Sequence, residues 1–257
     1  MSLAKRIMYY SLFSGADYFA EEWGQANTFY EWDNYALSPY GIIKRDFLKD
    51  VARFKNIKPY VPVAIIIPHE DKYFSTNGAY PAFVNDMVED LSLWKKINDY
   101  FDDGIYHGSE DQVFVSGKYG SLFDIIYDNS YDNPKKEYQL LVDFSGRLSG
   151  ENVVNGYDKE KTEKAIKEIT EKLPFVVNSN VGLDYQIFAD GEEKYVALYN
   201  HKGITKTQEN GEIKNANATA RWTICRKDGK ALQRLFLSGE NGVEGILSAG
   251  EIALYKL

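Results

Sequence analysis

The sequence predicts an α/β domain with a doubly wound parallel sheet, followed by a small all-β sandwich. The run Val-Pro-Val-Ala-Ile-Ile-Ile-Pro at 61–68 is apolar on both faces, which is typical of a strand covered by helices on both sides. Helical and strand patterns then alternate up to residue 178. After Gly182 the helical period disappears, and short apolar or alternating runs separated by Gly-containing turns indicate antiparallel strands.

Two helices and a short strand are expected ahead of that sheet. Residues 4–13 have the pattern of the last turns of a helix that ends at Gly15, and residues 16–23 are strand-like. Ser38 and Pro39 then supply an N-cap and a first-turn proline for a second helix. Because the pattern opens within a helix, we expect the first three residues to be an added start and the chain to be a piece of a longer protein.

The α/β part contains further elements with clear local signals. A long helix is expected at 81–104, and strands at 122–127, 138–144 and 175–178. Another helix at 158–173 has an aspartate N-cap and Glu–Lys pairs four residues apart. The predicted regions are therefore 1–58, 59–181 and 182–257.

Composition excludes several classes of protein. The chain has 257 residues, 30 Lys and Arg against 38 Asp and Glu, and a net charge of −8, so it lacks the basic surface of a nucleic-acid binder. No apolar run is long enough to span a bilayer, and we expect no membrane partner; the compartment stays undetermined. One cysteine and three separated histidines give no metal-ligand spacing, and we expect no metal or cofactor. The 15% aromatic content suits a sugar- or protein-binding surface or a dense core.

In a flavodoxin-like or amidotransferase-like sheet, ligands bind at the loops that follow the strands, so candidate site residues are expected there. His69, Glu70 and Asp71 follow the first strand and are candidate site residues, with simple loop solvation as the alternative. Amidotransferase chemistry needs a cysteine on a sharp strand-to-helix turn, whereas Cys225 lies in a predicted strand. The loop after the first strand also lacks the glycines of a phosphate site.

The N-terminal strand carries acids that suggest glycoside chemistry. Hydrolysis of a glycosidic bond requires two carboxyl groups on either side of the bond. Glu21 and Glu22 are expected to point to opposite faces of a strand, so they do not form such a pair. Either face is expected to contribute at most one wall of a site that other strands, not contained in this chain, complete. Trp23 is placed to stack on a sugar ring or to pack under the next loop.

The order of these parts resembles the C-terminal portion of β-galactosidase-like glycoside hydrolases, family 42 and relatives. The resemblance rests on Gly-Ala-Asp-Tyr-Phe-Ala-Glu-Glu-Trp at 15–23, Leu-Ser-Pro-Tyr-Gly at 37–41, Val-Ala-Ile-Ile-Ile-Pro at 63–68 and Ala-Gly-Glu-Ile-Ala-Leu-Tyr at 249–255. It implies that 1–58 is the remnant of a (β/α)8 barrel, that 59–181 is a flavodoxin-like domain that forms trimers, and that 182–257 is the closing β-sandwich.

The same resemblance places both catalytic glutamates upstream of this chain, so no catalytic residue is expected in it. Family members hold the sugar with an acid and a histidine after the eighth barrel strand; Glu31 is the nearest acid here, and no histidine accompanies it. The orphaned strand at 17–23 is expected to be rearranged, loosely ordered or paired elsewhere, since its backbone groups lack their neighbours.

Three hypotheses of function follow. The leading one is the non-catalytic C-terminal region of a galactosidase-like glycoside hydrolase, which supports oligomerisation and the architecture of the active site, with carbohydrate as the parent's partner. The alternative is a free-standing module that binds carbohydrate or protein through aromatic side chains. A third is a complete small-molecule enzyme built around His69, Glu70 and Asp71.

Overall fold

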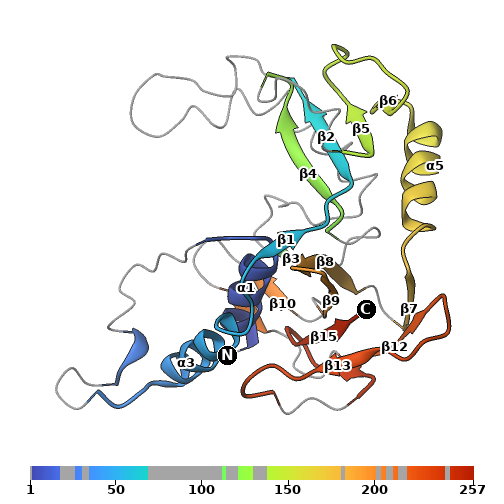
Figure 1. The fold of residues 1–257 in the computed structure, drawn as a ribbon. Helices are drawn as coiled ribbons and strands as arrows, with labels where there is room; N and C mark the ends of the chain where they lie inside the picture. Colours follow the sequence, from blue (N-terminus) through green and yellow to red (C-terminus); the bar gives the residue numbers. More distant parts are fainter. Residues whose placement is uncertain are drawn as a thin grey trace, which may run out of the picture. The chain divides into compact units, whose positions relative to one another are not determined.

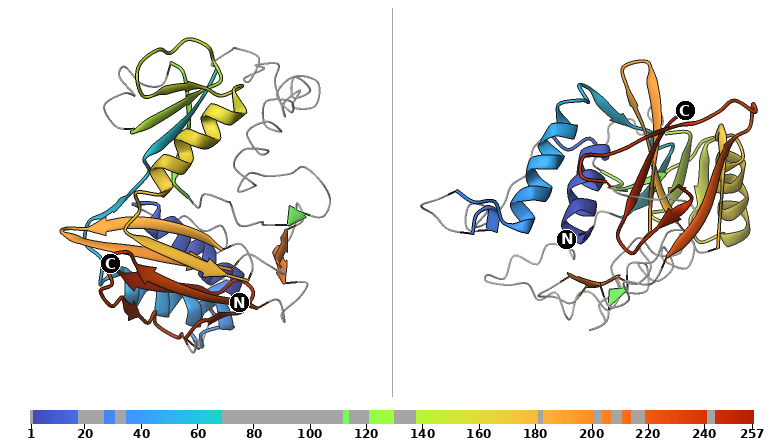
Figure 2. Two further views of the ribbon diagram at one scale, coloured as in Figure 1. Left: turned by 90° about the vertical axis from the view of Figure 1, so that its right-hand side faces the viewer. Right: turned by 90° about the horizontal axis from the view of Figure 1, so that it is seen from below.

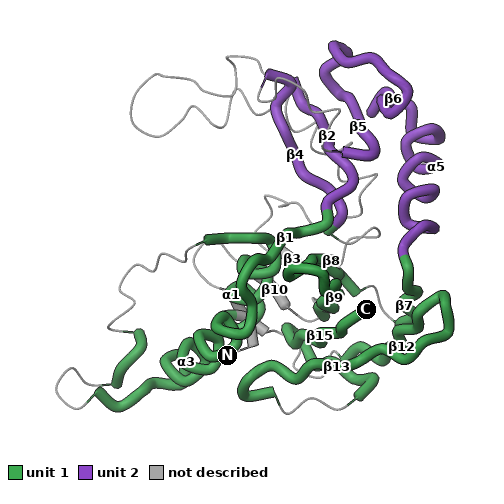
Figure 3. The backbone as a smooth tube through the Cα atoms, in the orientation of Figure 1, with its two compact units in different colours: residues 1–60, 106–121, 174–257 green, residues 61–105, 122–173 purple. Residues whose placement is uncertain are grey.

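The computed structural model of the chain has mixed α/β content, with one parallel sheet and several antiparallel sheets (Figure 1). The structure describes residues 2–17, 27–30, 35–68, 112–113, 121–129, 138–180, 183–200, 204–206, 211–213, 219–240 and 244–257. Two compact units are present (Figure 3): unit 1 comprises 1–60, 106–121 and 174–257, and unit 2 comprises 61–105 and 122–173. None of the helices in these described ranges is both long and apolar enough to cross a membrane.

Unit 2 contains the predicted parallel sheet. Its strands are β2 (Val63–Ile67), β4 (Phe123–Tyr127), β5 (Leu140–Asp143) and β6 (Val153–Asn155), in the spatial order β4-β2-β5-β6. All neighbouring pairs are parallel. Every residue of β2 is buried, as the apolar run on both faces predicted.

Helix α5 (Lys159–Thr170) follows β6 and confirms the predicted helix at its place in the chain. The Asp158 side chain accepts a hydrogen bond from the Lys161 amide and so satisfies one of the free N–H groups of the first turn. Thr162, Ile166 and Ile169 are buried and define the inner face of this helix. The predicted helix at 81–104 and the predicted strand at 17–23 contain residues outside the described ranges.

Unit 1 is built on antiparallel pairing. Its largest sheet has the order β1-β8-β9-β15-β13, and its strands are β1 (Ile57–Pro59), β8 (Asp184–Asp190), β9 (Glu193–Tyr199), β15 (Ile252–Lys256) and β13 (Gln233–Leu235). A second sheet joins β14 (Ile246–Leu247), β12 (Ala220–Arg226) and β7 (Phe175–Ser179). A third joins β11 (Gly211–Ile213), β10 (Ile204–Lys206) and β3 (Gln112–Val113).

The strand at 175–179 has a different partner from the one its position in the chain suggested. We expected it to close the α/β region, with a boundary at residue 181. Instead β7 pairs antiparallel with β12, and unit 1 begins again at Pro174. The apolar run predicted the strand correctly, but a short run carries no signal for which edge it joins.

The N-terminal helices also belong to unit 1. Helices α1 (Ser2–Phe13) and α3 (Pro39–Val51) contact each other, and α1 contacts β1 and β8 (Figures 1 and 2). Helix α1 ends at Phe13, and Gly15, the glycine predicted to stop it, adopts φ +82° just beyond its end. The region expected at 1–58 is therefore continuous with the C-terminal strands, because β1 pairs with β8 across a long stretch of sequence.

Aromatic side chains fill the space between these helices and the large sheet. Phe13 stacks on Phe188 with ring centroids 4.4 Å apart, and Phe188 stacks on Tyr195 at 5.1 Å. Tyr9 meets Phe47 edge to face at 5.2 Å. Such pairs add to the free energy gained by burying the rings, so this part of the aromatic content serves a core.

Candidate functional site

The side chains predicted from the sequence to form a site lie outside the described residues. They are Glu21, Glu22, Trp23, Glu31, His69, Glu70 and Asp71. The structure therefore brings none of them into a described site, and their roles stay predictions.

The carboxyl edge of the parallel sheet is organised by Asp143, the last residue of β5. This buried carboxylate accepts hydrogen bonds from the Ser145 amide at 2.8 Å, the Ser145 hydroxyl at 2.6 Å and the Leu148 amide at 3.0 Å. Three donors on one carboxylate hold the loop after β5 in one conformation and compensate for the burial of the charge. Asp143 thus has a structural role in the loop after β5.

A second interaction joins the loops after β4 and β5. The Arg147 guanidinium lies 2.8 Å from a carboxylate oxygen of Asp128, whose side chain is almost fully buried. The pair brings together residues from two neighbouring strand ends, which is the edge where parallel sheets bind ligands. The described ionisable groups here hold the loops together.

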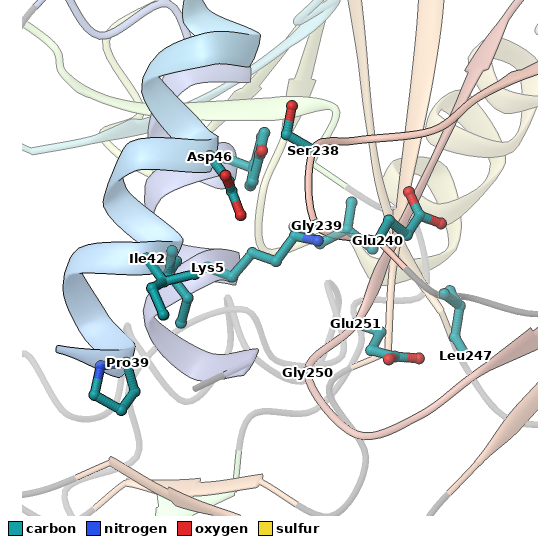
Figure 4. Close-up of a pocket in the computed structure, with 13 residues that line it drawn as sticks. Lys5, Pro39, Ile42, Asp46, Ser238, Gly239, Glu240, Leu247, Gly250 and Glu251 are labelled. Atoms are coloured by element: carbon teal, nitrogen blue, oxygen red, sulfur yellow. The ribbon is translucent and has the colours of Figure 1, made fainter. Parts of the chain in front are cut away.

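Unit 1 contains a pocket of about 500 Å³ between α1, α3 and the loops that flank β14 (Figure 4). This volume falls in the usual range for small-molecule sites. Aliphatic side chains and proline form most of its wall: Pro39, Ile42, Ile43, Leu247 and Ile252. The polar lining comes from Lys5, Tyr9, Asp46, Ser238, Glu240 and Glu251.

Asp50 lies behind the pocket wall and ties its parts together. The fully buried carboxylate accepts hydrogen bonds from the Tyr9 hydroxyl, from the Ser238 amide at 2.6 Å and hydroxyl at 2.8 Å, and from Arg53 at 2.9 Å. Burial alone would raise the pKa of Asp50, but these donors, Tyr9 first among them, outweigh it and lower the pKa. The network connects α1, α3 and the turn after β13.

Two of the lining acids are already neutralised by cations. Asp46 accepts from Arg45 at 2.9 Å and from Lys49 at 3.1 Å. Its slight burial favours a higher pKa, but these two cations hold the pKa of Asp46 below its ordinary value. Glu240 forms an ion pair with Arg234, and both side chains are only 6% exposed. These carboxylates are occupied within the protein.

Lys5 and Glu251 differ from these neutralised acids. Lys5 forms no ion pair with any carboxylate in the described part of the chain, and its Nζ lies 5.8 Å from the centre of the Tyr9 ring. One carboxylate oxygen of Glu251 accepts the Ser248 amide at 2.7 Å, and Glu251 has no cationic partner among the described residues. The pocket therefore offers one positive and one negative group on an aliphatic wall.

A metal centre finds no support in the described residues, because no three His, Cys, Asp or Glu side chains in them come together as ligands. The chain matches no protein-family model, and no match was found among curated proteins or solved structures. What the pocket binds must therefore be argued from its own lining.

The sequence contained one signal for this site that periodicity alone did not bring out. Asp50 lies three residues after Phe47, on the stripe of α3 that faces the core. An acid on a core-facing stripe needs buried donors, so it marks a polar network. Its partner Ser238 is 188 residues away in the sequence and has no local signal.

Proposed function

We propose that this chain is the non-catalytic C-terminal region of a galactosidase-like glycoside hydrolase, in which the parallel-sheet domain supports oligomerisation and the architecture of the active site. The observation that carries the proposal is the strand order of unit 2. Counted along the chain as first to fourth, β2, β4, β5 and β6 lie in the order second, first, third, fourth. This order matches the first four strands of the flavodoxin-like order 2-1-3-4-5, which supports the kind of domain that the resemblance implies.

The helices ahead of this sheet agree with the proposal. Helices α1 and α3 pack against each other. Successive helices of a (β/α)8 barrel lie next to each other in its outer ring, so the pair fits the last helices of such a barrel. Antiparallel strands close the chain, as the closing β domain requires.

The hydrogen bonds that the buried Asp50 and Asp143 carboxylates accept support a non-catalytic role. A glycosidase needs two carboxyl groups about 5–10 Å apart around the scissile bond, one of them free to donate a proton. Asp50 and Asp143 each accept several hydrogen bonds from their own chain. Carboxylates held in this way have structural roles, which agrees with a non-catalytic role for the described part of the chain.

Hydrolysis of chromogenic glycosides by the purified chain tests the absence of catalysis. We expect no turnover above that of a heat-denatured sample for galactosides, glucosides, mannosides and xylosides. Turnover that Glu21→Gln or Glu22→Gln abolishes would overturn the proposal, whereas turnover unchanged in both variants would indicate a contaminating enzyme.

Oligomerisation is tested separately by light scattering coupled to size-exclusion chromatography. We expect a mass above the 29.4 kDa of one chain, with a trimer as the specific expectation. A monomer at micromolar to tens of micromolar concentration would remove the oligomerisation role and leave the domain assignment standing.

A free-standing binding module is the second candidate; the pocket of unit 1 favours a binding role but does not single out a sugar as the ligand. A glycan-binding assay on the purified chain separates the two functions. Specific retention of a glycan by the isolated chain supports the module; the hydrolase-region proposal expects none.

A further inference from the structure

We propose that the pocket of unit 1 binds a small monocarboxylate with an apolar body, and that the Lys5 ammonium pairs with the carboxylate of this ligand. The pocket is formed within unit 1, and the inference does not depend on the hydrolase proposal. Its volume of about 500 Å³ admits a ligand of this size with room for water at the head group.

The apolar body follows from the wall of the pocket. Pro39, Ile42 and Ile43 come from α3, and Leu247 and Ile252 come from the β14–β15 region. In Figure 4, Leu247 lies across the pocket from Ile42. Aliphatic side chains on two walls favour a ligand that loses apolar surface to solvent on both of its faces.

A sugar fits this lining poorly. Tyr9 is the aromatic residue in the lining, but it is fully buried and its hydroxyl donates to Asp50. It therefore presents neither an open ring for stacking nor a free hydroxyl for a sugar. The pocket and the glycan-binding alternative consequently make different predictions about the ligand.

The carboxylate follows from Lys5. Its side chain extends from α1 across the pocket in Figure 4, and no described carboxylate pairs with it. In the remaining lining, Asp46 is bonded to Arg45 and Lys49, and Glu240 is paired with a buried arginine. Because those acids are already neutralised, the ammonium of Lys5 is available to an anionic head group.

The helix ends near Lys5 also favour a negatively charged ligand. Lys5 and Pro39 lie in the first turns of α1 and α3, and neither first turn contains an acidic residue. The positive ends of both helix dipoles are therefore left without a negative side chain in the turns that line the pocket. This adds to the attraction that Lys5 supplies for an anion.

The restriction to one carboxylate follows from Glu251. This acid lines the pocket near Leu247 and has no described cationic partner. A second carboxylate on the ligand would meet like charge in a wall of low polarity, which disfavours dicarboxylates. Lys5 and Glu251 together orient the ligand, with its head group at the Lys5 ammonium and away from Glu251.

Isothermal titration calorimetry with three eight-carbon probes tests the proposal: octanoate, octanamide and octanedioate. We expect the wild-type chain to bind octanoate about tenfold more tightly than octanamide, since a hydrogen bond to a charged group contributes about that factor. Octanedioate is also expected to bind more weakly than octanoate. Equal affinities for octanoate and octanamide, or no heat of octanoate binding up to its solubility limit, overturn the proposal.

Variants of the chain distinguish the contribution of the ligand's carboxylate to binding from that of its apolar body. Lys5→Met keeps the length of the side chain and should weaken octanoate about tenfold while leaving octanamide unchanged. Ile42→Asn, at a position 43% exposed, should weaken all three probes because it removes apolar wall. Lys58→Met is the matched control, since Lys58 is exposed on β1 and does not line the pocket. If Lys5→Met and Lys58→Met bind octanoate equally well, Lys5 is not the anchor.

Discussion

Replacing Asp50 with asparagine tests the polar network that ties α1 and α3 to the turn after β13. The carboxylate is fully buried and accepts from Tyr9, Arg53 and two groups of Ser238. Asparagine keeps one acceptor oxygen and places an NH2 group where the other oxygen was. That NH2 group faces donors, so at least one of them loses its partner inside the protein.

The expected cost is about 3 kcal/mol of unfolding free energy. Removing one partner of a buried ion pair costs about 3–5 kcal/mol, because the remaining charge is left uncompensated. The Arg53 side chain is 41% exposed, so water compensates for part of the loss, and the low end of that range applies. Ser238 and Tyr9 have less access to water and account for most of the effect.

Urea unfolding of wild-type chain and variant measures the free energy, and hydrogen exchange by mass spectrometry locates the effect. Faster exchange is expected in α1, α3 and the segment around Ser238, whose amide donates to Asp50. Asp46→Asn is the matched control: it lies one turn earlier on α3 and pairs with two half-exposed cations, so it should cost under about 1 kcal/mol. The reasoning fails if the two variants are destabilised equally.

The same carboxylate makes stability depend on pH in a defined direction. Burial favours a higher pKa for Asp50, but the hydrogen bonds from Tyr9, Ser238 and Arg53 prevail, and the folded-state pKa lies below the unfolded value of about 3.9. Its contribution is therefore complete above pH of about 4 and is lost as the pH falls through the folded-state pKa. The gap in stability between wild type and Asp50→Asn should narrow below pH 4; a gap that widens there would contradict this.

Three further substitutions test other parts of the structure by urea unfolding. Gly156→Ala should destabilise unit 2 by about 1–3 kcal/mol, because its Cβ would come within 2.6 Å of the Phe144 ring; an unchanged midpoint would contradict that close approach. Tyr199→Phe should cost about 1–2 kcal/mol, since it leaves the buried Gln186 side chain without the Tyr199 donor, and an absorbance titration should show one fewer tyrosine that resists ionisation at pH 11. Ser38→Ala removes the N-cap of α3 and should cost about 1 kcal/mol; Ser38→Asn, which restores a capping oxygen, should recover most of it.

Local signals predicted most of the elements that the structure describes. Ser38 and Pro39 begin α3, Asp158 begins α5, and Gly15 ends α1, because capping is decided within a few residues of the helix end. The run that forms β2 is buried throughout. Signals of this kind depend on neighbours along the chain and need no tertiary contact.

The pocket had no such signals, and its network had one, the position of Asp50 on the core-facing stripe of α3. Lys5 and Ser238 line the same pocket although they are far apart in the sequence. Asp50 was visible as an acid on an apolar stripe, but its donors come from another helix and from a distant turn. Interactions over such separations follow from packing and cannot be found from spacing.

The sequence by itself determined the elements with clear caps or apolar patterns, such as α3, α5 and β2, and their apolar faces; short strands such as β1 and β6 carried no such signal. Tertiary structure alone decided that β7 joins β12, that β1 joins β8, and that the N-terminal helices cover the large antiparallel sheet of unit 1. The physical reason is that a period of 3.6 or 2 residues specifies a face to be buried. The period does not specify which other apolar face will pack against the buried one, because the hydrophobic effect is non-directional and favours the burial of any apolar surface.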